Sequence, residues 1–137
     1  MKNMKILIGF VIVVGFMLIS CGDASSPSNI AKKYIEATKN YDFKAAKEYI
    51  AKEYEAEMDR IDEQMNTPEV QATVAAIRAA VKTPITRKVI DEKISKDGNS
   101  AIVTIRIEGQ GESYEEYLLM ILEDGVWKVN ENPSAWK

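Results

Sequence analysis

Histidine is absent from this 137-residue chain, and cysteine occurs only once, at Cys21. Histidine is the commonest general base and a leading metal ligand, so its absence removes the usual Ser-His and Cys-His arrangements and most zinc sites. A single cysteine cannot form a disulfide within the chain. No glycine-rich phosphate loop follows a predicted strand. We therefore expect no metal site and no cofactor, and we name no catalytic residue.

An excess of basic residues is also lacking. The chain has 18 Lys and Arg against 21 Asp and Glu, a formal net charge of −3. Nucleic-acid binding depends on a basic face that neutralises phosphates, so we expect no nucleic-acid partner. The length is that of one ordinary domain.

The N-terminus has the composition of a targeting segment. Met1–Lys5 carries two lysines and no acid, and Ile6–Ile19 is an apolar run of fourteen residues. A membrane-spanning helix needs about 20 apolar residues, whereas the apolar region of a signal peptide needs roughly 7–15. We interpret residues 1–20 as a signal peptide that is removed.

Leu18-Ile19-Ser20-Cys21 resembles the lipobox of bacterial lipoproteins, in which the cysteine thiol receives a diacylglyceryl group, with palmitate as a typical acyl chain. The resemblance implies that Cys21 is a lipid anchor, that the membrane is a partner through this lipid, and that the protein lies in the cell envelope on the extracytoplasmic side. Residues 21–28 then form a lipid-anchored tether of small polar residues, and residues 29–137 form the folded domain. The alternative is a retained N-terminal anchor helix with an incidental cysteine.

The first half of the domain is predicted to be helical. Ser26-Pro27 is a helix start, Asn40–Asp42 ends the first helix, and Asp42 and Thr67 are predicted N-caps of later helices. Two further segments repeat apolar residues at spacings of four, three and four, namely Tyr54, Met58, Ile61 and Met65, and then Val70, Val74, Ile77 and Val81.

The second half is predicted to be a sheet. Residues 85–95, 101–108, 113–123 and 126–129 have strand patterns, joined by turns at Asp97-Gly98, Gly109-Gln110-Gly111 and Asp124-Gly125. Ala101, Val103, Ile105 and Ile107 alternate with more polar positions and should face a core. Connections this short join antiparallel neighbours, so we predict an α+β fold in which N-terminal helices pack on a curved antiparallel meander sheet.

The order of these segments is similar to that of the NTF2-like (cystatin-like) superfamily, and especially of small bacterial lipoproteins with a DUF4878-type domain. The resemblance rests on residues 26–37, on the corner Asn40-Tyr41-Asp42-Phe43, and on the closing segment Asp124–Val129. It implies a cone in which the sheet wraps around a long helix, often with a pocket at its open end. The superfamily includes ketosteroid isomerase-like enzymes, transport factors and binding domains, so the fold does not name a function.

Several side chains are candidates for a site, each with a structural alternative. Glu115 and Glu116 beside Tyr117 are the best catalytic candidates, and Asp91, Glu108, Glu112 and Tyr114 lie on the same strands; the alternative is a solvated face. Tyr54 and Met58 are candidates to line a ligand groove, and Trp127 to form a pocket wall, with core packing as the alternative for all three. Trp136 could bind a partner or pack on the sheet edge.

The leading interpretation is a non-enzymatic cell-envelope lipoprotein that binds a small apolar ligand or another envelope protein. A ketosteroid isomerase-like lyase or isomerase would need a buried carboxylate facing a cavity. A protein inhibitor or assembly factor would need an exposed apolar patch.

Overall fold

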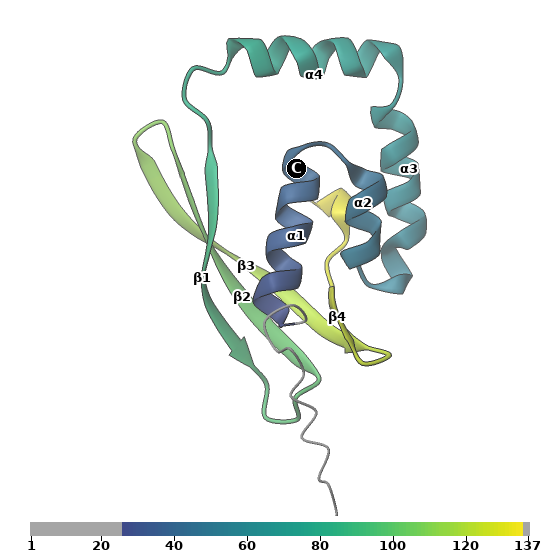
Figure 1. The fold of residues 1–137 in the computed structure, drawn as a ribbon, viewed down its shortest axis with the longest axis vertical. Helices are drawn as coiled ribbons and strands as arrows, with labels where there is room; N and C mark the ends of the chain where they lie inside the picture. Colours follow the sequence, from purple (N-terminus) through teal and green to yellow (C-terminus); the bar gives the residue numbers. More distant parts are fainter. Residues whose placement is uncertain (1–25, 136–137) are drawn as a thin grey trace, which may run out of the picture.

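A computed structural model describes residues 26–135 (Figure 1). Helices occupy the first half of this range and strands the second, in the order α1 (Pro27–Lys39), α2 (Phe43–Ala46), η1 (Lys47–Tyr49), η2 (Lys52–Tyr54), α3 (Glu55–Met65), α4 (Pro68–Ala80), β1 (Thr86–Ile94), β2 (Ser100–Gly109), β3 (Glu112–Glu123), β4 (Val126–Val129) and η3 (Pro133–Ala135). The predicted signal peptide, Cys21 and Trp136 lie outside the described residues.

Side-chain caps start the first two helices as predicted. The Ser26 hydroxyl accepts a hydrogen bond from the backbone N–H of Asn29 at 3.2 Å, and the Asp42 carboxylate accepts one from that of Ala45 at 3.0 Å. Thr67 does occupy the N-cap position of α4, but its side chain makes no cap. Its hydroxyl instead donates to the carbonyl of Gln64, because the preceding turn offers this acceptor. The prediction of a Thr67 cap is therefore wrong.

The four strands form one antiparallel sheet in the sequential order β1-β2-β3-β4, which confirms the predicted meander (Figure 1). Each turn uses backbone with positive φ, at Gly98, at Gln110 and Gly111, and at Asp124 and Gly125. Tight hairpin turns require this conformation because it matches the twist of the strands.

The core lies between α1 and the inner face of the sheet. Along β2 the predicted register is confirmed, since Val103, Ile105 and Ile107 are buried while Ile102 is 41% exposed. Tyr34 of α1 and Met58 of α3 are buried in the same cluster, and Leu118, Met120 and Val129 complete it from β3 and β4. Alternation along the strands therefore separates a core face from an outer face.

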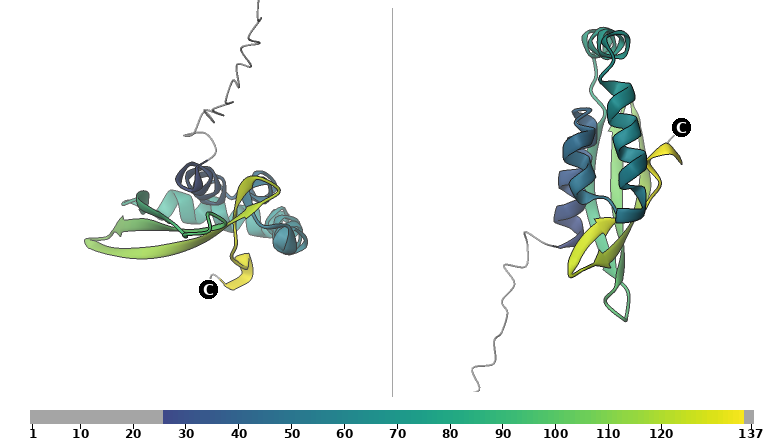
Figure 2. Two further views of the ribbon diagram at one scale, coloured as in Figure 1. Left: turned by 90° about the horizontal axis from the view of Figure 1, so that it is seen from below. Right: turned by 90° about the vertical axis from the view of Figure 1, so that its right-hand side faces the viewer.

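Figure 2 shows α1 against one face of the sheet and the C-terminal η3 on the other side. α4 differs from the other helices, because it runs across one end of the molecule from α3 to the linker before β1 (Figures 1 and 2). This end lies opposite the start of α1. Among the helices between Ser26 and Ala135, none combines the length and apolar character that a membrane crossing requires.

Candidate functional site

The apolar stripe of α4 is only partly used in packing. Val74 is buried at 8% exposure, whereas Ile77 is 49% exposed and Val81, the residue that follows the last turn of α4, is 50% exposed. Large apolar side chains that stay exposed side by side mark interaction sites more often than scattered ones do.

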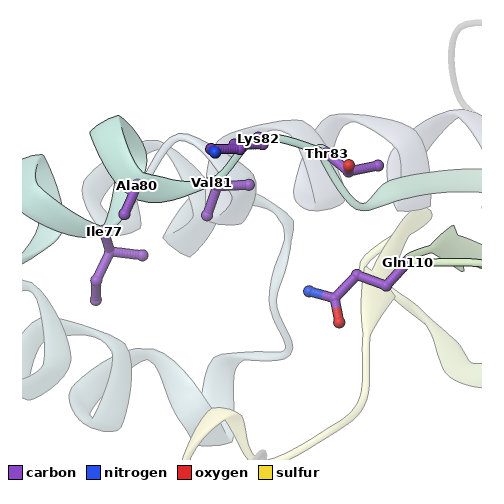
Figure 3. Close-up of a pocket in the computed structure, with 6 residues that line it drawn as sticks. All are labelled: Ile77, Ala80, Val81, Lys82, Thr83 and Gln110. Atoms are coloured by element: carbon purple, nitrogen blue, oxygen red, sulfur yellow. The ribbon is translucent and has the colours of Figure 1, made fainter.

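These side chains line a pocket of about 410 Å³ beneath the C-terminal end of α4 (Figure 3). We call it the α4 pocket and define it by Ile77, Ala80, Val81, Lys82, Thr83 and Gln110. The first three form an apolar wall, and the last three add an ammonium, a hydroxyl and a carboxamide. In Figure 3 the Gln110 side chain approaches the pocket from the turn between β2 and β3, facing the α4 side.

Gln110 occupies an unusual position for its residue type. Its backbone φ is +53°, in the region that favours glycine, asparagine and aspartate. A non-glycine residue held in this region costs free energy, and such residues cluster at functional sites. The sequence pattern predicts only a hairpin turn for this segment. The one local sign of a further role is a glutamine at a turn position where a smaller polar residue or glycine is usual.

The α4 pocket combines an apolar wall with three polar side chains. Ligand pockets typically combine apolar walls with a few polar groups that fix orientation. The ammonium of Lys82 favours a negative or carbonyl-rich edge, and the Gln110 carboxamide can both donate and accept hydrogen bonds. No histidine, carboxylate or tyrosine lines this pocket.

A second pocket of about 310 Å³ lies where α1 meets α2 and η1. Lys33, Glu36, Asn40 and Asp42 are among its lining residues, so charged and amide groups take a larger part in its lining than in that of the α4 pocket. The α4 pocket is the better candidate because it has a continuous apolar wall.

The three residues predicted from sequence to bind ligand lie elsewhere. Met58 is fully buried in the core, and Tyr54 and Trp127 are partly buried and pack against it. None of the three lines either pocket. A role for them in ligand binding stays a prediction, and their packing places them in the structural framework.

The catalytic candidates on β3 do not converge. Glu115 pairs with Arg106 across the strands, and these side chains form an ion pair at 3.2 Å on the outer face. Glu116 pairs with Ile105 and so lies on the inner face, where it is nevertheless exposed. Adjacent strand residues point to opposite faces, so these two carboxylates cannot act as a pair.

Within residues 26–135 no acidic side chain is buried, and no cluster of three or more potential metal ligands occurs. Two acids have shifted pKa values, and both shifts are downward. Hydrogen bonding to Arg60 lowers the pKa of Glu57, and hydrogen bonding to Ser95 lowers that of Asp97. Burial, followed by the charge of Glu131, raises the pKa of the Tyr34 phenol, which therefore stays protonated.

The sequence profile of the family described as "Putative lumazine-binding" matches residues 24–132. The chain belongs to this family. Its structure is similar to the crystal structure of a protein named "Putative NTF2-like transpeptidase" from Campylobacter jejuni, with a TM-score of 0.52 and 17% sequence identity over 78% of this chain and 99% of that chain. At this identity the likeness shows the fold alone, and that fold is NTF2-like, as the sequence predicted. No curated protein matches the sequence. The DUF4878-type assignment stays a prediction.

Proposed function

We propose that this protein is a lipid-anchored protein of the bacterial cell envelope whose NTF2-like domain binds a small, flat, mainly apolar molecule in the α4 pocket. The observation that carries the proposal is the half-exposed pair Ile77 and Val81, which line the pocket together with the polar side chains of Lys82 and Gln110. The family description supports the flat shape of the ligand, because lumazine is a fused-ring heterocycle, and the carbonyls and nitrogens of such a ring would be bound by the polar side chains of the pocket.

A binding role fits this pocket better than catalysis. The ketosteroid isomerase-like alternative needs a carboxylate poised in an apolar cavity with a raised pKa. The α4 pocket has no carboxylate, and the carboxylate of Glu116 is exposed rather than enclosed. A carboxyl group that titrates above roughly pH 6 in an NMR titration would reverse this preference.

The anchor and the pocket would lie at opposite ends of the molecule. Ser26 caps the start of α1, and α4 crosses the other end (Figure 1). Cys21 precedes Ser26 by five residues, so a lipid on its sulfur would hold the start of α1 near the membrane. The α4 pocket would then lie at the end of the domain that is farther from the bilayer.

Fluorescence titration of the full chain in mild detergent tests ligand binding. The probes are lumazine and anilinonaphthalene sulfonate (ANS), which combines fused apolar rings with an anionic edge. We expect Val81→Asp to weaken probe binding by at least about tenfold, since a charge in the apolar wall must be desolvated. Gln110→Ala should weaken binding less. The control is Ile102→Asp, on the outer face of β2. Equal affinity of parent and Val81→Asp for both probes would refute binding at this pocket.

Metabolic labelling with palmitate tests the anchor. Cys21→Ser should abolish both the label and the removal of residues 1–20, because only a thiol forms the thioether. A variant that still incorporates palmitate would refute the lipobox assignment.

One observation favours a second candidate, the binding of another envelope protein through the outer face of the sheet. Ile102 and Leu119 are direct cross-strand partners and are 41% and 47% exposed, and Tyr117 beside them is 62% exposed. α1 lies against the other face (Figure 2). Exposed apolar side chains on neighbouring strands are typical of protein contacts. Loss of a copurifying protein in Ile102→Asp, with probe binding intact, would identify this function.

A further inference from the structure

α4 is held to the rest of the domain by few contacts. Its neighbour in the chain is α3, and Val74 is its only buried side chain. The segments at its two ends are the turn at Asn66-Thr67 and the linker of residues 81–85, which contains Pro84. A helix with so little buried surface opens more easily than the core does, unless a specific contact holds it.

Arg78 makes such a contact with the corner between α1 and α2. Its Nη2 donates a hydrogen bond to the backbone carbonyl of Asn40 at 3.0 Å. Its Cζ lies 5.0 Å from the centroid of the Tyr41 ring, which is within the range of a cation–π interaction. A guanidinium can make both contacts at once because it is planar and carries several donors.

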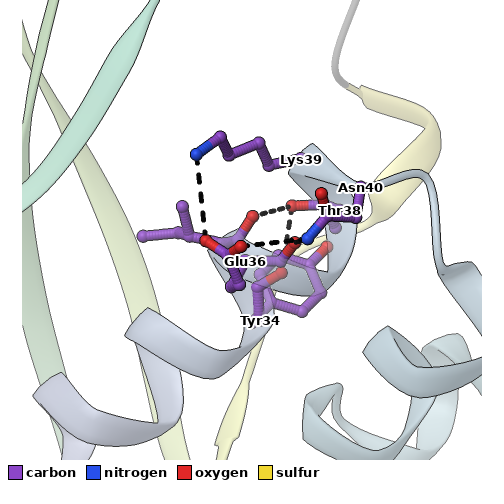
Figure 4. A network of polar contacts seen from close by, with 6 residues as sticks. Tyr34, Glu36, Thr38, Lys39 and Asn40 are labelled. Atoms are coloured by element: carbon purple, nitrogen blue, oxygen red, sulfur yellow. Dashed lines mark hydrogen bonds and ion pairs between the residues drawn. The ribbon is translucent and has the colours of Figure 1, made fainter.

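The corner that receives Arg78 is itself rigidly built. Thr38 donates to the carbonyls of Tyr34 and Ile35, and the Asn40 amide donates to Glu36, which closes the last turn of α1 (Figure 4). The backbone of Tyr41 has a φ of +58°, an uncommon conformation for an aromatic residue. This conformation, together with the edge-on contact of its ring with Phe43 at 6.4 Å, presents Tyr41 to α4.

Two of the three non-glycine residues with positive φ in the described chain, Tyr41 and Gln110, therefore meet α4 or its pocket. Gln110 forms one side of the pocket, and the ring of Tyr41 contacts Arg78, the residue after Ile77 in α4. Backbone strain that gathers around one element is consistent with a functional geometry there.

We propose that Arg78 is a positioning residue. By binding Asn40 and Tyr41 it fixes the position of α4, which forms the upper wall, or roof, of the pocket. The apolar residues of this wall are thereby kept opposite Gln110. This inference rests on the proposed function of the α4 pocket. Arg78 itself does not line the pocket. Release of Arg78 would let the roof move on its end segments and would lower affinity for a ligand that contacts both the roof and Gln110.

Hydrogen exchange measured by mass spectrometry on the full chain, without ligand, tests the contact directly. In Arg78→Gln we expect the amides of α4 to exchange about tenfold faster than in the parent, because a cation–π contact and one hydrogen bond are lost. Exchange in β2 and β3 should not change. Arg78→Lys keeps the charge over Tyr41 but loses the planar guanidinium, and should give an intermediate rate. Arg87→Gln, at an exposed arginine on β1, is the matched control.

ANS titration of the same variants tests the consequence for the pocket. Arg78→Gln should bind ANS several-fold more weakly, Arg78→Lys should recover part of the affinity, and the control should match the parent. Unchanged exchange of α4 in Arg78→Gln would overturn the inference, whatever ANS does. Faster exchange with unchanged ANS affinity would overturn the positioning role. A parent that binds neither ANS nor lumazine refutes the proposed function instead.

Discussion

The segments 54–65 and 70–81 have the same apolar spacing and lie in different environments. The second position of each stripe is buried, with Met58 at 0% and Val74 at 8% exposure. The third position differs, because Ile61 is half-buried whereas the corresponding Ile77 is 49% exposed beside a pocket. Both segments are helical, as their periodicity predicts. A periodic stripe therefore predicts a helix and its apolar face. Whether other elements pack against that face depends on residues elsewhere in the chain.

Two isoleucines of β2, three positions apart on opposite faces of the sheet, give the largest expected difference in stability between a buried and an exposed site. Ile105→Asp places an unpaired charge in the core, where its parent side chain is 4% exposed, and should cost several kcal/mol of a total stability of about 5–15 kcal/mol. Ile102→Asp, on the outer face, should cost less than about 1 kcal/mol. Urea unfolding of both variants measures this. Similar midpoints for the two would contradict the register of β2.

Truncation of Met58 and of Ile77 tests whether the two helical stripes differ in how they are packed. Met58→Ala should lower the free energy of unfolding by about 2–5 kcal/mol, because it removes fully buried atoms and leaves a cavity. Ile77→Ala should lower it by less than about 1 kcal/mol and should instead weaken ANS binding. If Ile77→Ala destabilises as much as Met58→Ala, α4 is packed and the pocket is not open.

The N-cap residues of α2 and α4 are expected to differ less in their contribution to stability. Asp42→Ala removes a carboxylate that accepts the N–H of Ala45, and should cost about 1 kcal/mol. Thr67→Ala should cost only a few tenths of that, since the Thr67 hydroxyl bonds the preceding turn and does not cap α4. Thermal melting by circular dichroism resolves the two. Equal losses would mean that Thr67 caps α4 in solution.

The smallest effect is expected at the β1–β2 turn, where the Asp97 carboxylate accepts hydrogen bonds from Ser95 and from the N–H of Asn99. These bonds lower its pKa below the ordinary 3.8, so they favour folding above that pH and lose their effect as pH falls through the lowered value. Asp97→Asn should therefore melt slightly below the parent at neutral pH, and the gap should close in acid. A gap that persists in acid would contradict this origin.

The candidate site was the part that sequence reasoning could least predict. Val81 was identified as the end of an apolar stripe and Gln110 as part of a turn, and nothing in their local patterns connects them. They line one pocket because the β2–β3 hairpin and the end of α4 reach the same end of the fold. The opposite faces of Glu115 and Glu116 were implicit in strand alternation, but the inner position of Glu116 required the pairing with Ile105.

The sequence by itself determined the helices, the strands, their order, and the buried face of β2, because these depend on local signals: caps, turns that need positive φ, and periodicities of 3.6 and 2. The tertiary structure decided which apolar residues become core and which line a pocket. Burial of a side chain depends on how segments far apart in the chain are placed against one another, as Arg78 is placed against Asn40, and the local sequence pattern does not contain this information.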